Sequence, residues 1–306
     1  MAILTEEFQK KLQELYGQSG EEWAASLPDL LAKCEARFAI ALDTAFSNLS
    51  WNLLVRASTN RGEAVVLKVG VLREELARES RVLHACKGRG AVRVLDFDDD
   101  LGAMVLERAI PGTPLSQCGD DDAATGTFCD VFSKLHGEPR ASFVDYPTIE
   151  EHFAAIHRYQ QKYPHGDGPL PNRWVDFAAH TLQKLVSSTT QPSLLHADLH
   201  HDNILSHGSD WIFIDPKGVV GDIHFDTVQY LLNYPTRGAD AETVLARRID
   251  IISQKLGLEA ERIVLWGVTR GVLEACWGLE GTNDGMDGMA IASLFSKLLE
   301  PGFSLE

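Results

Sequence analysis

A run of polar residues with fixed spacing lies at positions 195–205, where the chain reads LHADLHHDNIL. Asp198 precedes Asn203 by five residues, and a second acid, Asp215, follows the apolar residues 211–214. Asp198 is predicted to accept the proton of an attacking hydroxyl group. Asn203 and Asp215 carry the hard oxygen ligands that Mg²⁺ requires beside a nucleotide phosphate. These residue types at this spacing predict a phosphoryl-transfer site that uses ATP and Mg²⁺.

The residues between Asn203 and Asp215 predict how both side chains reach one cavity. Residues 204–205 read as a short strand, the polar residues 206–210 as a turn, and residues 211–214 as a strand that pairs back. This hairpin would return Asp215 to the loop that precedes the first strand.

Two alternative interpretations apply to this segment. Asp198 and Asn203 could cap a turn, since both residue types form local hydrogen bonds. The histidines could bind zinc, but no cysteine lies nearby and Mg²⁺ prefers oxygen. We therefore expect His196 to brace the loop through a buried hydrogen bond, and the other histidines to lie at the surface or on the substrate side.

Upstream, the apolar residues 64–67 read as a strand that carries Lys68 at its end, and residues 72–86 have helical composition. On its own Lys68 would be an ordinary solvated lysine at a strand end. With the downstream signature, it becomes the candidate lysine for binding the nucleotide phosphates.

The predicted helix offers three glutamates as partners for Lys68. Three of its leucines share one face at the helical period of about 3.6 residues, namely Leu72, Leu76 and Leu83. Glu79 falls within this stripe, Glu75 at its edge and Glu74 on the far side. Because a buried carboxylate needs a partner, we predict a Lys68–Glu79 ion pair, with Glu75 as the alternative.

Residues 91–106 read as two strands joined by an acidic turn, and the Pro-Gly pair at 111–112 then breaks regular structure. This position predicts a hinge. The adenine ring would hydrogen-bond backbone groups near Glu107 and Arg108.

The predicted fold class is α+β with two lobes. Residues 1–106 would form a nucleotide-binding lobe with a leading helix, an antiparallel sheet and one bracing helix. Residues 107–306 would form a mainly helical catalytic and substrate-binding lobe. ATP is expected to lie between them.

One feature that protein kinases normally have is missing from the turn before Lys68. Residues 46–52 contain no GxGxxG run to cover the phosphates. Ser47, Asn48 and Ser50 offer hydroxyl or amide donors instead. The departure argues against a protein kinase.

The strings LLHADLHHDNIL at 194–205 and FIDPKGVVGDIHFD at 213–226, with a tryptophan-bearing C-terminal helix, resemble the aminoglycoside/hydroxyurea phosphotransferase family, which includes streptomycin 6-kinases. A leading helix and a turn at 27–30 fit the same order. The DPKG run at 215–218 is the most discriminating piece. Ala197 departs from the family pattern, which usually has glycine there, and its methyl group restricts the loop backbone.

The resemblance implies a protein-kinase-like fold and ATP-dependent transfer of the γ-phosphate to a hydroxyl of a streptomycin-like aminoglycoside or of hydroxyurea. Choline, fructosamine and sugar kinases share the same catalytic residues, so a small-metabolite kinase is the second hypothesis. A nucleotide-binding protein without catalysis is the third.

Two further acids, Asp222 and Asp226, precede a predicted helix at 228–232. They could bind substrate or metal. We favour a structural role in which they cap this helix and pin the loop, as acids near helix N-termini do.

A long helix is predicted at 263–280 with two faces. The core face holds Leu265, Val268, Val272 and Leu279. The other holds Trp266, Arg270, Glu274, Trp277 and Glu280, and Asn283, Asp284 and Asp287 follow. Aromatic rings among carboxylates suit a pocket for a cationic sugar, so Glu274, Trp277 and Glu280 are substrate candidates. The alternative is a solvated acidic helix whose tryptophans pack against neighbours.

Composition narrows the class of partner. The 306 residues carry a formal net charge of −16, which disfavours nucleic acid and anionic membranes and favours a cationic small molecule. The first residues do not read as a signal peptide, and no apolar stretch has transmembrane length. Five cysteines without a CxxC pair suit a reducing cytoplasm. The oligomeric state is not predicted.

Overall fold

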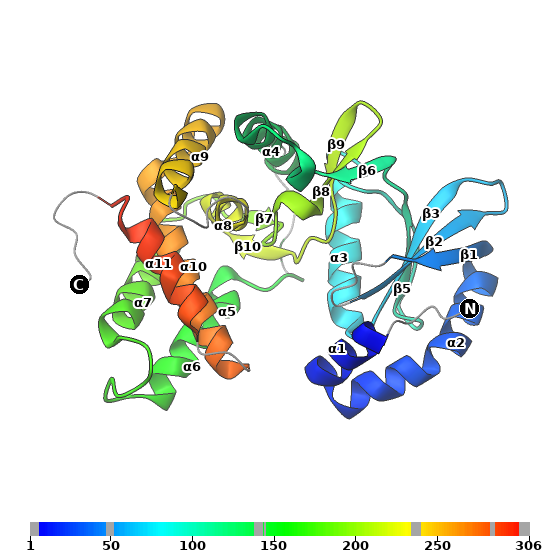
Figure 1. Cartoon of the computed structure of the whole chain (residues 1–306), viewed down its shortest axis with the longest axis horizontal. Helices are drawn as coiled ribbons and strands as arrows, with labels where there is room; N and C mark the ends of the chain where they lie inside the picture. The colour runs from blue at the N-terminus through cyan, green and yellow to red at the C-terminus, as the bar shows by residue number, and fades with distance from the viewer. Residues whose placement is uncertain are drawn as a thin grey trace. The chain divides into compact units, whose positions relative to one another are not determined.

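The computed structural model describes residues 6–46, 52–137, 143, 145–233, 240–281 and 285–299. The chain divides into two compact units, Met1–Gly112 and Thr113–Glu306. The division therefore falls after Gly112 rather than after residue 106. Figure 1 shows the helices and strands of each unit.

The first unit contains an antiparallel sheet preceded by two helices. Its elements are α1 (Glu6–Tyr16), α2 (Gln18–Phe38), β1 (Ile40–Ala45), β2 (Asn52–Thr59), β3 (Ala64–Gly70), α3 (Arg73–Cys86), β4 (Val94–Asp98) and β5 (Ala103–Glu107). The strand order is β1-β2-β3-β5-β4, and every neighbouring pair is antiparallel. The central strand, β3, is therefore paired on both edges.

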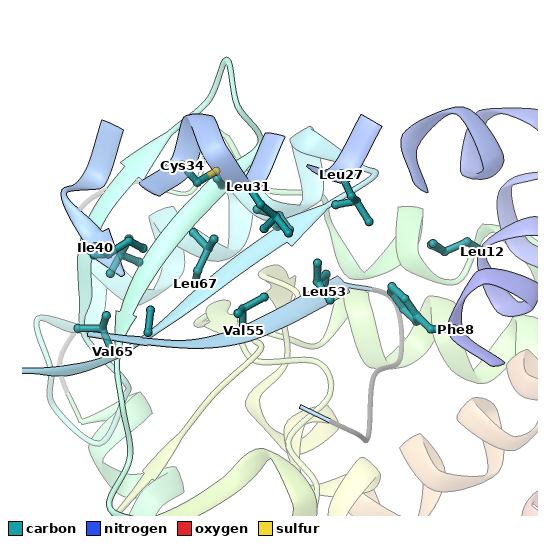
Figure 2. Packing of buried hydrophobic residues seen from close by; sticks show 14 residues of the cluster. Phe8, Leu12, Leu27, Leu31, Cys34, Ile40, Leu53, Val55, Val65 and Leu67 are labelled. Carbon is teal, nitrogen blue, oxygen red and sulfur yellow. The ribbon is translucent and has the colours of Figure 1, made fainter. Parts of the chain in front are cut away.

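The two faces of β3 have different roles. Val65, Leu67 and Val69 join a buried apolar cluster with side chains of α1 and α2, part of which is labelled in Figure 2. Because side chains alternate along a strand, Lys68 points to the opposite face. The helix that packs against that face of the sheet is α3, which carries Glu79.

The predicted turn at 27–30 is wrong, because α2 continues through it with Pro28 inside the helix. Proline removes one helical hydrogen bond and crowds the preceding turn. Leu27 and Leu31 lie on one helical face and are 1% and 5% exposed. Their burial against the sheet offsets the local cost of Pro28.

The second unit is mainly helical. Its strands and 3₁₀ turns are β6 (Pro111–Pro114, which begins in the first unit), η1 (Leu115–Gln117), β7 (Ser193–Leu195), η2 (His201–Asn203), β8 (Ile204–His207), β9 (Asp210–Phe213), β10 (Val219–Gly221) and η3 (Ile223–Thr227). Its helices are α4 (Asp121–His136), α5 (Ile149–His152), α6 (Ala154–Lys162), α7 (Asn172–Ser187), α8 (Val228–Leu232), α9 (Ala241–Leu256), α10 (Ala260–Glu280) and α11 (Met286–Ser296).

Two short antiparallel pairs frame the segment from 195 to 219. β7 pairs with β10, and β8 pairs with β9 in a hairpin whose last pair is His207 with Asp210. The turn therefore contains only Gly208 and Ser209, not the whole of 206–210 as predicted. Gly208 has φ 59°, which glycine adopts without steric cost.

Helices α10 and α11 pack closely in the core of the second unit, because glycines face the contact. A Cβ at Gly271 would lie 2.4 Å from the backbone nitrogen of Ala292, and one at Gly288 would lie 2.2 Å from that of Ala275. The prediction of an α+β chain with an antiparallel sheet first and a mainly helical remainder is confirmed. None of the helices in the described ranges is long and apolar enough to cross a membrane.

Candidate active site

The first unit holds a buried ion pair between Lys68 and Glu79. Lys68 Nζ lies 2.6 Å from Glu79 Oε2 and 2.8 Å from Oε1, and each residue is 4% exposed. Glu74 and Glu75 are exposed. A buried ion pair contributes little net stability, because desolvation offsets the attraction. The pair is thus better explained by a need to place the ammonium group than by folding.

One of the three leucines predicted to share the buried face of α3 lies outside it. Leu72 is the N-cap residue of α3 and is 42% exposed. Leu76 and Leu83 are buried, as Glu79 is. The helical period therefore predicted the buried face of α3 correctly, but the helix begins at Arg73, one residue later than predicted.

Glu107 ends β5, and its side chain already has a partner. Its carboxylate accepts hydrogen bonds from the backbone nitrogen of Arg93 at 2.8 Å and from Arg93 Nε at 2.7 Å. Arg108 follows and is half-buried. Adenine binding by the backbone of these two residues stays a prediction. Ser47, Asn48 and Ser50 lie outside the described residues.

In the second unit, the loop after β7 is held by the buried carboxylate of Asp226. Asp226 is 1% exposed and accepts hydrogen bonds from the backbone N–H groups of His196 at 2.8 Å and Ala197 at 2.6 Å. His136 Nε2 lies 3.0 Å from the same carboxylate. Asp226 therefore pins the loop, which agrees with the structural role favoured from the sequence.

His196 braces the loop from within, as predicted. Its ring is fully buried, and burial lowers its pKa, so the imidazole is neutral. Nδ1 accepts a hydrogen bond from the backbone N–H of Asp198 at 3.2 Å, and Nε2 donates to the carbonyl of Ile214 at 2.9 Å. The ring thereby links Asp198 to Ile214, the residue before Asp215.

Asn203 and Asp198 are in direct contact. Asn203 Nδ2 donates to the carbonyl of Asp198 at 2.9 Å and lies 3.5 Å from its Oδ2. The backbone N–H of Ile214 donates to the carbonyl of Asn203 at 2.9 Å, which holds the segment before Asp215 against the loop. Asp198 keeps a side chain that is 24% exposed. The predicted base is thus fixed by its backbone and accessible at its carboxylate.

Asp215 joins this group through Lys217. Lys217 Nζ lies 3.1 Å from Asp215 Oδ2 and 3.9 Å from Asp198 Oδ2. Asp215 has φ 60°, a left-handed conformation that is uncommon outside glycine. The three oxygen-bearing residues expected to converge are therefore connected, Asn203 directly to Asp198 and Asp215 to Asp198 through Lys217.

The donor set is suited to Mg²⁺ rather than to zinc. The Asn203 amide nitrogen is used by the Asp198 carbonyl, which leaves Oδ1 as the atom that can bind a cation. Within the described ranges, no group of three or more His, Cys, Asp or Glu side chains is placed to hold a metal ion. Mg²⁺ would thus depend on Asn203, Asp215 and phosphate oxygens together.

His201 corrects the expectation that the remaining histidines lie at the surface or beside the substrate. It is 2% exposed and stacks on Tyr230, with 4.1 Å between ring centroids. Arg248, which is fully buried, lies 3.5 Å from His201 Nε2 and pairs with Asp121 at 2.5 Å. Burial, followed by the charge of Arg248, lowers the pKa of His201 to about 3.

This group anchors η2, and therefore Asn203, to α4, α8 and α9. Sequence reasoning missed Arg248, Asp121 and Tyr230. Nothing local identifies them, since Asp121 and Arg248 are 127 residues apart.

Helix α10 differs from the predicted two-faced helix. Trp266 was assigned to the pocket face but is fully buried, and its Nε1 donates to Asp222 at 2.7 Å. Asp222 also accepts from Arg262 and from the backbone N–H of His224, and it caps η3. Asp222 therefore has a structural role, as favoured from the sequence, but the predicted capping of the helix at 228–232 is wrong, because the N-cap of α8 is Thr227 and no side chain in the described ranges caps it.

The three substrate candidates on α10 lie near cationic side chains of the protein itself. Glu274 pairs with Arg270 at 2.5 Å, and the Arg270 guanidinium lies 4.9 Å from the centre of a Trp277 ring. Glu280 pairs with Arg158 at 2.7 Å, and that hydrogen bond lowers its pKa. A substrate role for these residues stays a prediction. Of the polar residues expected to follow them, Asn283 and Asp284 lie outside the described residues, and Asp287 is exposed in the first turn of α11.

Comparison with known proteins identifies the family. A model of the aminoglycoside/hydroxyurea antibiotic resistance kinase family matches residues 40–281. The chain is 30% identical over 284 residues to the streptomycin 6-kinase of Streptomyces griseus, covering 90% of this chain and 89% of that protein. It is 28% identical over 272 residues to the hydroxyurea phosphotransferase of Kitasatospora aureofaciens, covering 86% and 76%.

A solved structure shows the same fold. A thermostable mutant of the aminoglycoside phosphotransferase APH(4)-Ia, in ternary complex with AMP-PNP and hygromycin B, matches with a TM-score of 0.65 at 15% identity, over 90% of this chain and 100% of that one. The family model spans residues 40–281, well over half of the sequence, and the streptomycin 6-kinase is 30% identical over 90% of it, so the chain belongs to the aminoglycoside/hydroxyurea antibiotic resistance kinase family.

Proposed function

We propose that the protein is an ATP-dependent phosphotransferase that acts on a hydroxyl group of a streptomycin-like aminoglycoside or of hydroxyurea. The observation that carries the proposal is the placement of Asp198. Its carboxylate is 24% exposed, and its backbone is fixed by His196 and Asn203. An accessible carboxylate on a rigid loop is what a catalytic base for a bound hydroxyl requires.

In the proposed reaction, Asp198 accepts the proton of the acceptor hydroxyl. The hydroxyl oxygen forms a bond to the γ-phosphorus, and the bond from that phosphorus to the oxygen bridging the β- and γ-phosphates breaks, which releases ADP. Asp198 later returns the proton to solvent. Lys68, held by Glu79, binds phosphate oxygens of the nucleotide.

Asn203 and Asp215 are the proposed ligands of Mg²⁺. When bound, Mg²⁺ would neutralise part of the charge on the triphosphate. A relative of the same fold was crystallised with AMP-PNP, which supports an adenine nucleotide as the donor.

The acceptor is proposed from the relatives. One is a streptomycin 6-kinase and another a hydroxyurea phosphotransferase, at 30% and 28% identity. The net charge of −16 favours a cationic acceptor such as streptomycin. On α10, a cationic group of the acceptor would compete with Arg270 for Glu274 and with Arg158 for Glu280.

The test is an ADP-release assay with ATP and Mg²⁺ across streptomycin, other aminoglycosides, hydroxyurea, choline and simple sugars. We expect turnover with streptomycin or hydroxyurea. Asp198→Asn should abolish it while leaving nucleotide binding, measured by calorimetry, within about twofold of wild type. Asp202→Asn is the matched control, since it removes the same charge from an exposed residue that bonds to Ser116.

Asp202→Asn should keep the wild-type rate. Turnover only with choline or a sugar would replace the proposed acceptor. Undiminished turnover in Asp198→Asn would remove Asp198 from the role of base.

A further inference from the structure

Lys217 contacts two acids, Asp198 in the loop after β7 and Asp215 after β9. Its Nζ lies 3.1 Å from Asp215 Oδ2 and 3.9 Å from Asp198 Oδ2. The first distance is a charge-assisted hydrogen bond, and the second is an ion-pair distance without one. One ammonium group therefore faces both the proposed base and a proposed metal ligand.

The backbone around Lys217 fixes where its side chain can reach. The N–H of Lys217 donates to the carbonyl of His196 at 2.8 Å, which joins it to the loop that carries Asp198. Just beyond, Val219 pairs with Leu195 in the antiparallel ladder between β10 and β7. Gly218 has φ 68°, so the turn between the two contacts has a conformation that favours glycine. The backbone of Lys217 is thus held at a fixed position beside the loop that carries Asp198.

The positive charge of Lys217 acts on both carboxylates. Two carboxylates that share a site repel each other, and a cation between them offsets the repulsion. The Lys217 side chain is 35% exposed, so solvent screens part of the interaction. The ammonium group also sets the charge that a divalent cation or a phosphate meets at Asp215.

We propose that Lys217 is a positioning residue for phosphoryl transfer, which keeps the carboxylates of Asp198 and Asp215 at a fixed separation and balances their charge. This inference rests on the proposed function, because it assigns the two acids to base and metal ligand. Lys217 acts through them. A merely structural Lys217 would stabilise the loop, but it would not set the attraction of this site for cations.

The experiment compares Lys217→Met, which removes the charge, with Lys217→Arg, which keeps it. Lys134→Met is the matched control, since Lys134 also pairs with an aspartate, Asp210, and its side chain is 34% exposed. The readouts are kcat and KM for the acceptor, thermal stability, and binding of Mn²⁺ alone by electron paramagnetic resonance without nucleotide.

We expect Lys217→Met to lower kcat by about 10- to 100-fold, as displaced supporting residues do. KM for the acceptor should stay within about twofold. Mn²⁺ should bind up to about tenfold tighter, because a competing positive charge has left Asp215. Lys217→Arg should restore kcat and Mn²⁺ affinity toward the wild-type values. Lys134→Met should change neither kcat nor Mn²⁺ affinity.

Mn²⁺ binding that is unchanged or weaker in Lys217→Met, with thermal stability lowered, would overturn the inference in favour of a structural role. A kcat that is unchanged in this variant would overturn it as well. Either result leaves the proposed function intact, provided that the wild-type protein turns over. Failure of the wild-type protein to phosphorylate any hydroxyl compound would instead reject the proposed function itself.

Discussion

Asp226 holds Ala197 in a left-handed turn: the backbone nitrogen of Ala197 lies 2.6 Å from Asp226 Oδ1, and Ala197 has φ 62°. A residue with a Cβ adopts this conformation at a cost of about 1–2 kcal/mol. The turn directs the chain from the buried His196 to the accessible Asp198. A buried carboxylate thus maintains a strained backbone where the proposed base is presented.

Asp226→Asn should weaken this support. The carboxylate accepts from two backbone N–H groups and contacts His136, and an amide nitrogen would face at least one donor. We expect the free energy of unfolding to fall by about 3 kcal/mol, and kcat to fall as well. Asp222→Asn is the matched control, because Asp222 is also buried in the same region but bonds to Trp266 and Arg262.

Denaturant unfolding and the ADP-release assay measure both effects. Asp222→Asn should lose stability with little change in kcat at a temperature where it is folded. An equal fall in kcat for both variants would mean that Asp226 has no special role in placing Asp198.

Ala197→Gly should stabilise the protein. Glycine adopts positive φ without a Cβ clash, and this gain exceeds its larger entropy in the unfolded chain. We expect the free energy of unfolding to rise by about 0.5–1 kcal/mol. Ala39→Gly is a parallel case away from the loop, since Ala39 is an exposed helix C-cap with φ 52°. Both should be stabilising in thermal unfolding, and a destabilised Ala197→Gly would contradict the left-handed turn.

Local patterns predicted those parts of the molecule that depend on short stretches of chain. The choice of Glu79 over Glu75 follows from the period of one helix, and the structure places Glu79 against Lys68. The helix at Val228–Leu232 was predicted with the bounds it has. Each of these is decided by residues a few positions apart, where periodicity is informative.

Contacts between distant segments could not be predicted in this way. The burial of His201 depends on Tyr230 and Arg248, which belong to later helices. Trp266 looked suited to a pocket, and only its partner Asp222 shows that it belongs to the core. Pro28 reads as a break in one segment, but the sheet that covers α2 lies later in the chain. Tertiary packing overrides local preference in each case.

Glu79→Gln tests the ion pair in the first unit. The variant leaves the Lys68 ammonium buried without its carboxylate, so the free energy of unfolding should fall by about 3–5 kcal/mol. KM for ATP should rise, because the lysine is no longer fixed toward the phosphates. Glu75→Gln is the control on the same helix, exposed in the structure. It should match wild type in chemical denaturation and in ATP titrations. A larger loss of stability in Glu75→Gln than in Glu79→Gln would make Glu75 the partner of Lys68.

His201 should make stability depend on pH. Its pKa is about 3 in the folded protein, owing first to burial and then to the charge of Arg248, whereas an unfolded histidine titrates near about 6.5. Between these values the unfolded chain binds more protons, so the free energy of unfolding falls as pH decreases. The stabilisation is fully present above the unfolded pKa, and about 2 kcal/mol of it should be lost by about pH 5.

Urea unfolding of wild type and His201→Phe at neutral pH and at about pH 5 measures this contribution. Phenylalanine keeps a ring against Tyr230, which lies 4.1 Å from the His201 ring centre, but it cannot take up a proton. The variant should therefore lose less stability on acidification than wild type, by about 2 kcal/mol. Equal losses in both proteins would mean that His201 is protonated at similar pH in the folded and unfolded chains, which would be incompatible with its burial beside Arg248.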